Sequence, residues 1–193
     1  PIYNTKNSGK LKGELGGLCQ EKNTNTVLCA AKLLQELGVI KNCNTDISEE
    51  RQWTNLRLGF TNVCEMTGLM GRWQLLGTRP TIICDTGHNV GGWEYISEQL
   101  GSVECKKMHI VIGMVNDKDI TSVMAMMPKD AIYYFTKASV KRARDEHEVK
   151  TIGEEAGLHG ECYKDVKTAF EVARKSADEN DFIFVGGSSF IVA

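Results

Sequence analysis

Polar side chains able to bind an anion or transfer a proton follow several apolar runs of this sequence. The run TIICD at 81–85 ends in Asp85 and is followed by His88, and the run DFIFVGG at 181–187 is followed by Ser188. Arg142 follows a further apolar run, AIYYFT at 131–136. A carboxylate, a histidine, a guanidinium and a hydroxyl beside flexible glycines predict a site for an anionic or nucleotide-like ligand.

The position of these residues depends on an alternation of apolar and amphipathic segments that begins at Thr81. Short apolar runs separated by helical patterns are typical of repeated β–α units and of a mostly parallel sheet. The sequence therefore predicts the α/β class, with a mostly parallel β-sheet flanked by helices. Because such sheets bind ligands beyond the carboxyl ends of their strands, we expect the polar residues above to lie at one edge of the sheet.

The first part of the chain has a different pattern. Residues 1–17 are polar and Gly-rich without a clear period, whereas 23–37 carry apolar residues at helical spacing, with Gly38 as a stop signal. A second helix is predicted from about Ser48 to Phe60. Two helices and a loop do not make a self-contained domain. We therefore expect 1–67 to be the mainly helical end of a larger domain, 68–80 to be a linker or hinge, and 81–193 to be an α/β domain.

Composition excludes several classes of protein. The 193 residues include 23 Lys and Arg against 25 Asp and Glu, a net charge of −2, so general nucleic-acid binding is not expected. Hydrophobic residues make up 41%, which is enough for a folded core. No apolar run approaches the roughly 20 residues needed to cross a bilayer, and no signal-like segment opens the chain. A soluble, cytoplasmic protein without a membrane partner is expected.

Cysteine usage and known catalytic signatures narrow the chemistry further. The seven cysteines are odd in number and lack a C-x-x-C pair, which argues against a disulfide framework or a zinc site. The sequence contains no G-x-x-x-x-G-K-[ST], no G-x-G-x-x-G after a strand, no G-x-S-x-G and no H-E-x-x-H. A hydrolase triad of Asp85, His88 and Ser188 is disfavoured, because Ser188 follows a terminal strand rather than a strained elbow.

Taken in order, five short motifs resemble those of one protein family. The motif D-x-x-H-N at 85–89, preceded by G-R-W-Q at 71–74, resembles the C-terminal region of folylpolyglutamate synthase/dihydrofolate synthase, which belongs to the Mur ligase superfamily. The further similar segments are LCQEKNTNTVLCAA at 18–31, GMVNDKD at 113–119, Arg142-Ala143, and GSSFIV at 187–192. The departures from the family pattern are Met70, Thr86, Gly87 and Val90.

The resemblance implies an ATP-dependent ligase that joins L-glutamate to dihydropteroate or folates through an acyl phosphate. The family carries its P-loop and magnesium ligands in an N-terminal ATPase domain that this sequence lacks. The chain is therefore expected to be a C-terminal fragment, inactive alone. Residues 1–67 would end the central ATPase domain, 81–193 would form the Rossmann-like C-terminal domain, and the closing residues would lie in a terminal strand.

The same resemblance implies the cofactors and partners. ATP and Mg²⁺ are the implied cofactors, with Mg²⁺ held mainly by the missing domain and no metal ligand expected in this chain. The implied partners are L-glutamate, folate or dihydropteroate, ATP and the missing N-terminal ATPase domain, and a monomer is expected.

Residue by residue, the resemblance assigns five roles, two of them catalytic (Arg72 and His88). Arg72 would contact phosphate oxygens of ATP, Asp85 its ribose, and Asn23 its adenine or phosphates. His88 would contact the incoming glutamate or the reacting phosphoryl group, and Ser188 a carboxylate of glutamate. The structural alternatives are a surface salt bridge for Arg72, a helix N-cap for Asp85 or Asn23, a polar surface position for His88, and a simple turn for Ser188.

Two other functions remain open from the sequence. One is another Mur-type amide ligase, acting on a peptidoglycan precursor. The other is a non-catalytic α/β module that binds a nucleotide or anion.

Two residues within the motifs are expected to shape loops rather than touch ligand: Lys118, between Asp117 and Asp119, and Asn89, in the turn after Asp85.

Overall fold

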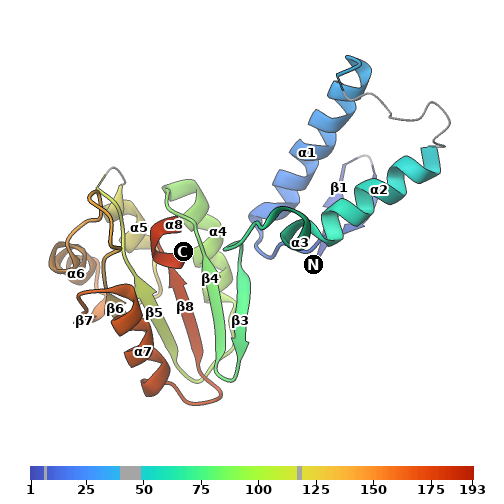
Figure 1. The fold of residues 1–193 in the computed structure, drawn as a ribbon. Coiled ribbons are helices and arrows are strands. Elements are labelled where there is room, and N and C mark those ends of the chain that lie inside the picture. The colour runs from blue at the N-terminus through green and yellow to red at the C-terminus, as the bar shows by residue number, and fades with distance from the viewer. Residues whose placement is uncertain (7, 40–48, 117–118) are drawn as a thin grey trace. The chain divides into compact units, whose positions relative to one another are not determined.

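The computed structural model describes residues 1–6, 8–39, 49–116 and 119–193, with the backbone alone at 49–53 (Figure 1). The chain divides into two compact units, Pro1–Met70 and Gly71–Ala193. None of the helices in the described residues is long and apolar enough to cross a membrane.

The N-terminal unit combines a hairpin with helices. Strands β1 (Ile2–Thr5) and β2 (Gly9–Lys12) pair antiparallel. Helices α1 (Cys19–Glu36), α2 (Glu49–Thr61) and α3 (Val63–Thr67) follow. Tyr3 and Leu11 are buried, and the Tyr3 hydroxyl donates to the carbonyl of Leu15 at 2.6 Å. The prediction of a mainly helical unit missed this hairpin, and the predicted start of the second helix at Ser48 lies outside the described residues.

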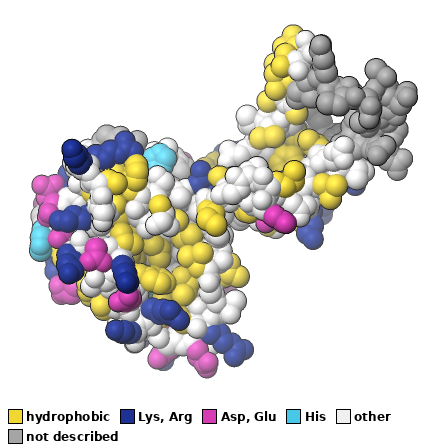
Figure 2. Space-filling model, viewed as in Figure 1, with side chains coloured by type: hydrophobic (Ala, Val, Ile, Leu, Met, Phe, Trp, Pro, Cys, Tyr) yellow, Lys and Arg dark blue, Asp and Glu magenta, His cyan; other side chains and the backbone are white. Residues whose placement is uncertain are grey.

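Much of the apolar face predicted for the first helix is exposed in this unit. Val27, Leu33, Leu34 and Leu37 of the α1 region all rank among the exposed large hydrophobic residues. Figure 2 shows hydrophobic side chains gathered along α1.

A six-stranded sheet forms the centre of the C-terminal unit. Its strands are β3 (Gln74–Thr78), β4 (Thr81–Asp85), β5 (Met108–Ile112), β6 (Ile132–Phe135), β7 (His159–Cys162) and β8 (Phe182–Gly186). The strand order is β3-β4-β8-β5-β6-β7. All pairs are parallel except β3–β4, which confirms the predicted fold class.

Helices cover both faces of this sheet (Figure 1). They are α4 (Val90–Gly101), α5 (Ile120–Met126), α6 (Glu146–Glu155), α7 (Val166–Ser176) and α8 (Ser189–Val192). One core contains residues of α4, α5 and α6, among them the fully buried Trp93. The core on the other face contains Ala169 and Ala173 of α7 and Ile191 of α8. Because both faces are packed, polar chemistry is confined to the ends of the strands.

Two predicted boundaries are wrong. The expected linker at 68–80 is divided, since the C-terminal unit begins at Gly71 and Gln74–Thr78 pairs with β4 as an edge strand. The closing residues, expected in a terminal strand, instead form α8 after β8 ends at Gly186. The Ser188 side chain caps this helix by accepting from the Phe190 N–H, and helical backbone follows.

Candidate functional site

The ends of β4 and β8 lie next to each other. These central strands are parallel neighbours, and their register places Asp85 opposite Gly186. The loops at 86–89 and 187–188 therefore leave the sheet at the same edge. This register brings Asp85, His88 and Ser188 into one region, although about a hundred positions separate the first from the last.

The Asp85 carboxylate holds two loops at this edge. Its Oδ2 accepts a hydrogen bond from the Trp73 backbone N–H at 2.7 Å, and its Oδ1 accepts from the Gly87 N–H at 2.7 Å. The residue is 8% exposed. The carboxylate thus fixes both its own loop and the turn that carries Arg72.

Two influences act on the protonation of Asp85. Burial raises its pKa above the ordinary value for a carboxyl group. The hydrogen bonds from Gly87 and Trp73 and the positive charge of Arg72 act in the opposite direction, because they favour the ionised form. Burial is the larger influence.

The turn before β3 is held by further hydrogen bonds. The Gly71 carbonyl accepts from the Thr86 N–H at 2.9 Å and from the Thr86 hydroxyl at 3.1 Å. The Gly71 N–H donates to Gln74 Oε1 at 2.8 Å. Trp73 is the one described non-glycine residue with a positive φ, at 47°, a conformation that costs energy for a bulky side chain. The network compensates for that strain.

Arg72 lies at the centre of this turn and is half-buried. One guanidinium nitrogen, Nη1, donates to the Gly71 carbonyl at 3.2 Å. Among the described residues, Arg72 forms no salt bridge, so the structural alternative of a surface ion pair is not observed. Its planar guanidinium therefore lies beside the edge where β4 and β8 end. That geometry suits recognition of phosphate oxygens.

His88 is exposed at the same edge. Its Nδ1 lies 3.1 Å from the Thr86 carbonyl oxygen. Since a carbonyl only accepts, Nδ1 carries the proton and Nε2 is the nitrogen directed to other partners. The next residue, Asn89, caps α4 by accepting from the Gly92 N–H at 2.8 Å. This confirms that Asn89 shapes the turn, and it shows that the N-cap alternative for Asp85 is wrong.

Ser188 follows a closely packed glycine. Gly187 has φ 104°, and a side chain there would collide with the carbonyl oxygen of Gly113 at the end of β5. Ser188 itself is 2% exposed, and its Oγ accepts from the Phe190 N–H at 3.0 Å. In this structure the Ser188 side chain therefore stabilises the local turn, as the structural alternative predicts. Its hydroxyl hydrogen can still donate to a ligand.

A third loop reaches the same region through Arg142. Its guanidinium carbon lies 4.7 Å from the centre of the Phe190 ring, a cation–π contact. The Asn116 N–H donates to the Arg142 carbonyl at 3.0 Å, which joins this loop to the one after β5. Lys118 and Asp117, which the sequence placed in that loop, lie outside the described residues.

One predicted site residue belongs to the other unit. Asn23 lies within α1, and its Nδ2 donates to Gln20 Oε1 at 3.2 Å. The helix begins at Cys19 with Leu18 at the N-cap position, so the N-cap alternative for Asn23 is wrong.

The hydrogen bonds at this edge do not form a hydrolase relay. Asp85 is bonded to backbone N–H groups, His88 to a carbonyl oxygen, and Ser188 to the N–H of Phe190 at the start of α8. Among the residues that the structure describes, no group of three or more His, Cys, Asp or Glu side chains could hold a metal ion. The edge offers a cation, an imidazole and backbone amides to an anionic ligand.

Thr86, Gln74 and the Trp73 N–H hold the site together, and the sequence analysis assigned them no role. Thr86 stood out only as a departure from the family motif. The Trp73 donor is a backbone N–H, which almost every residue type carries, so the sequence does not reveal it. Only the pairing of β3 with β4, which brings 71–74 back beside Asp85, makes these contacts visible.

The fold is that of an α/β domain whose candidate site residues lie at the carboxyl edge of a mostly parallel sheet. The family model "Mur ligase, glutamate ligase domain" matches residues 71–189. The chain belongs to this family.

Comparison with individual proteins gives the same result. The chain is 29% identical over 126 residues to a probable bifunctional folylpolyglutamate synthase/dihydropteroate synthase of Haloferax volcanii, covering 64% of this chain and 15% of that protein. It is 26% identical over 127 residues to a dihydrofolate synthase/folylpolyglutamate synthase of Buchnera aphidicola, covering 65% and 30%. The chain thus spans less than a third of the length of either relative.

A solved structure has the same fold along nearly the whole chain. The folylpolyglutamate synthase of Mycobacterium tuberculosis complexed with ADP superposes with a TM-score of 0.73 at 19% identity. The match covers 96% of this chain and 41% of that one. At this level of identity the likeness concerns the fold.

Proposed function

We propose that this chain is the C-terminal, glutamate- and ATP-contacting part of an ATP-dependent ligase that adds L-glutamate to dihydropteroate or folates. The observation that carries the proposal is the convergence of Arg72 and His88, with Ser188, at the edge where β4 and β8 end, within a domain of the glutamate ligase family. The folate relatives favour this substrate class over a peptidoglycan precursor or a non-catalytic module.

The reaction requires activation of a carboxylate. A carboxylate resists attack by an amine because oxide is a poor leaving group. Transfer of the γ-phosphoryl group of ATP to the folate carboxylate gives an acyl phosphate and ADP. The amine of glutamate then attacks the acyl carbon, phosphate leaves, and the amine loses a proton as the amide forms. Positioning and neutralisation of phosphate charge are the main contributions a protein makes to such a step.

Arg72 and Asp85 would act on the nucleotide. Arg72 would place its guanidinium on phosphate oxygens, held there by the turn that Asp85 and Thr86 fix. Each Asp85 oxygen accepts one backbone hydrogen bond. Each therefore keeps a lone pair for a ribose hydroxyl. Asn23, from the N-terminal unit, would contact the adenine or phosphates.

His88 and Ser188 would act on glutamate. With the Nδ1 proton directed to the Thr86 carbonyl, Nε2 of His88 would contact the incoming glutamate or the reacting phosphoryl group. Ser188 would donate its hydroxyl hydrogen to a glutamate carboxylate.

Other parts of the ligase would complete the site. The N-terminal unit would be the end of a central ATPase domain, and its exposed apolar residues on α1 support contact with the rest of that domain. ATP and Mg²⁺ would be the cofactors, with Mg²⁺ held mainly outside this chain. We propose a cytoplasmic monomer without nucleic-acid or membrane partners.

The test uses both this chain and the intact ligase. The chain alone is expected to show no turnover, and mixing it with the separately produced remainder is expected to restore folate-dependent ATP consumption. In the intact ligase, combined Arg72→Ala and His88→Ala is expected to abolish glutamate ligation. Arg174→Ala with His159→Ala is the matched control, because both residues are exposed and lie on other elements.

The outcomes separate the candidate functions. Normal glutamate ligation by the Arg72/His88 variant would contradict the assigned roles. A preference for UDP-muramyl peptides over folates in a substrate panel would replace the proposal by a peptidoglycan ligase. Binding of nucleotide without ligation of any substrate in the panel would favour the non-catalytic module.

A further inference from the structure

A cavity extends from Trp73, beside the candidate site, to the amino ends of β4 and β8. Its volume is about 480 Å³, within the usual range for small-molecule sites. Thr81 and Phe182, at the amino ends of β4 and β8, line it, and Thr78 lines it from the end of β3. The residues assigned to nucleotide and glutamate lie at the carboxyl ends of these strands or beyond them, and none of them lines the cavity.

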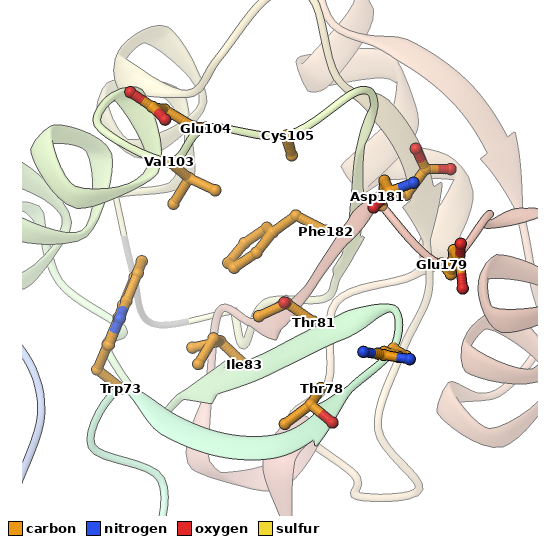
Figure 3. A pocket seen from close by; sticks show the side chains of 12 residues that line it. Trp73, Thr78, Thr81, Ile83, Val103, Glu104, Cys105, Glu179, Asp181 and Phe182 are labelled. Atoms are coloured by element: carbon orange, nitrogen blue, oxygen red, sulfur yellow. The ribbon is translucent and has the colours of Figure 1, made fainter.

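The floor of the cavity suits a flat ring. Figure 3 shows Phe182 at its centre, with Trp73 on one side and Ile83 and Val103 nearby. The Trp73 and Phe182 rings are stacked, with centroids 6.4 Å apart and planes 28° from parallel. Burial raises the pKa of the Cys105 thiol, so this wall stays uncharged at neutral pH. Because Phe182 is 3% exposed and Trp73 is half-buried, Trp73 is the ring that an aromatic ligand can reach.

The rim of the cavity carries charges of both signs. Arg79 supplies an exposed guanidinium, and Glu104 and Glu179 supply exposed carboxylates. Asp181 also lines the cavity, but its side chain is 1% exposed and lies 3.3 Å from His109 Nε2, so it is committed to the interior. The groups left for a ligand are a cation and two anions around an apolar floor.

We propose that this cavity binds a small zwitterion with an aromatic side group, the chemistry of an aromatic α-amino acid. The ring lies against Trp73, the ligand carboxylate faces Arg79, and the ligand ammonium faces one of the two rim carboxylates, Glu104 or Glu179. This site does not rest on the ligase proposal, since none of its residues is assigned to nucleotide or glutamate.

Trp73 links the cavity to the candidate site. Its indole lines the cavity, while its backbone N–H donates to Asp85 Oδ2 at 2.7 Å and its neighbour is Arg72. The positive φ of this residue, 47°, means that its backbone is held in a strained conformation. A ligand that shifts the indole therefore acts on the turn that carries Arg72.

The test is a titration of the ¹⁵N-labelled chain with L-phenylalanine, followed by NMR. The Trp73 indole signal is assigned from Trp73→Phe and is expected to shift on binding, together with the amide signals of Gly71 and Arg72. Phenethylamine, which lacks the carboxylate, and 3-phenylpropionate, which lacks the amine, are the matched probes. Each is expected to bind about two- to fivefold more weakly, as suits exposed ion pairs.

Charge variants complete the test. Arg79→Gln is expected to lower the affinity for L-phenylalanine about two- to fivefold and to leave phenethylamine unchanged. Glu104→Gln with Glu179→Gln is expected to lower the affinity for L-phenylalanine and for phenethylamine, and to leave the affinity for 3-phenylpropionate unchanged. Because these side chains are exposed, the variants are expected to fold, as their amide spectra will show.

Three outcomes would overturn the proposal. The site is refuted if the Trp73 indole signal does not move at the solubility limit of L-phenylalanine. Equal affinity for all three probes would refute the zwitterion assignment. A shift of the indole signal with unchanged Gly71 and Arg72 amides would refute the link to the candidate site.

Discussion

Asp85 Oδ2 accepts a hydrogen bond from the Trp73 backbone N–H at 2.7 Å, so the last residue of β4 fixes the turn that presents Arg72. A carboxylate can accept at both oxygens, whereas a carboxamide offers one oxygen and one donor group. The identity of residue 85 therefore matters for local structure before any ligand is considered.

Asp85→Asn is expected to destabilise the C-terminal unit by about 1–3 kcal/mol, because one of two partly buried N–H groups loses its acceptor. Urea unfolding followed by circular dichroism measures the change. Asp130→Asn, at an exposed position, is the control and is expected to have little effect. An Asp85→Asn chain as stable as the original would contradict the role of both hydrogen bonds.

The hydroxyl of Thr86 is expected to contribute separately to the same turn. Thr86→Val keeps the shape but removes the donor to the Gly71 carbonyl, with an expected loss of about 0.5–1.5 kcal/mol. Thr86→Ser keeps the donor and is expected to retain most of the stability, as urea unfolding will show. Faster hydrogen exchange of the Thr86 amide is expected in the valine variant only. If serine and valine destabilise equally, the methyl group rather than the hydroxyl holds the turn.

The central strands could be predicted from the sequence because they are buried on both faces. The segments IIC, IVI, IYYF and FIFV are continuous apolar runs, and each lies within a strand of the sheet. The rule that parallel sheets bind ligands beyond their carboxyl ends then placed Asp85, His88 and Ser188 together. The register of β4 with β8 confirms that placement.

The edge strands could not be recognised in the same way. The β3 segment QLLGT exposes Leu75 and Leu76 and contains a glycine, so neither alternation nor a continuous apolar run marks it. The β1–β2 hairpin has one buried apolar residue in each strand, Tyr3 and Leu11. The turn at 71–73 depends on β3, and its contact with Asp85 uses a backbone group. Residue types alone therefore predicted the candidate residues but not the contacts that hold their loops in place.

The pH dependence of stability is expected to include a contribution from Asp165, the N-cap of α7. Its pKa is lowered chiefly by the hydrogen bond from the Thr168 N–H. A carboxyl group whose pKa is depressed in the folded state stabilises that state above its unfolded pKa, about 3.9. The contribution is lost as the pH falls through the lower, folded value.

Thermal unfolding between pH 6 and pH 3 measures this effect. Asp165→Asn keeps a cap but cannot ionise, so the variant is expected to lose less stability on acidification than the original chain. Glu155→Gln, at an exposed position at the end of α6, is the control for a lost surface charge. Identical pH profiles of the Asp165→Asn and original chains would contradict the assignment.

Gly187 is expected to tolerate no side chain. Its φ is 104°, and a Cβ would collide with the Gly113 carbonyl oxygen, which belongs to the backbone at the end of β5. Gly157 provides a matched control, since its φ is 81° but an added Cβ meets nothing within 4 Å. Gly157→Ala is expected to cost about 1–2 kcal/mol from backbone strain alone. Gly187→Ala is expected to cost more, because β8 must also move away from β5.

Urea unfolding of both variants separates strain from close approach. The difference between them measures the contact of Gly187 with Gly113. Because Ser188 follows Gly187 directly, the amide signals of 188–190 are expected to shift in Gly187→Ala, while those near Gly157 alone shift in the control. Equal destabilisation by the two substitutions would show that the close approach at the ends of β5 and β8 contributes nothing, and that any residue able to adopt a positive φ could support the Ser188 loop.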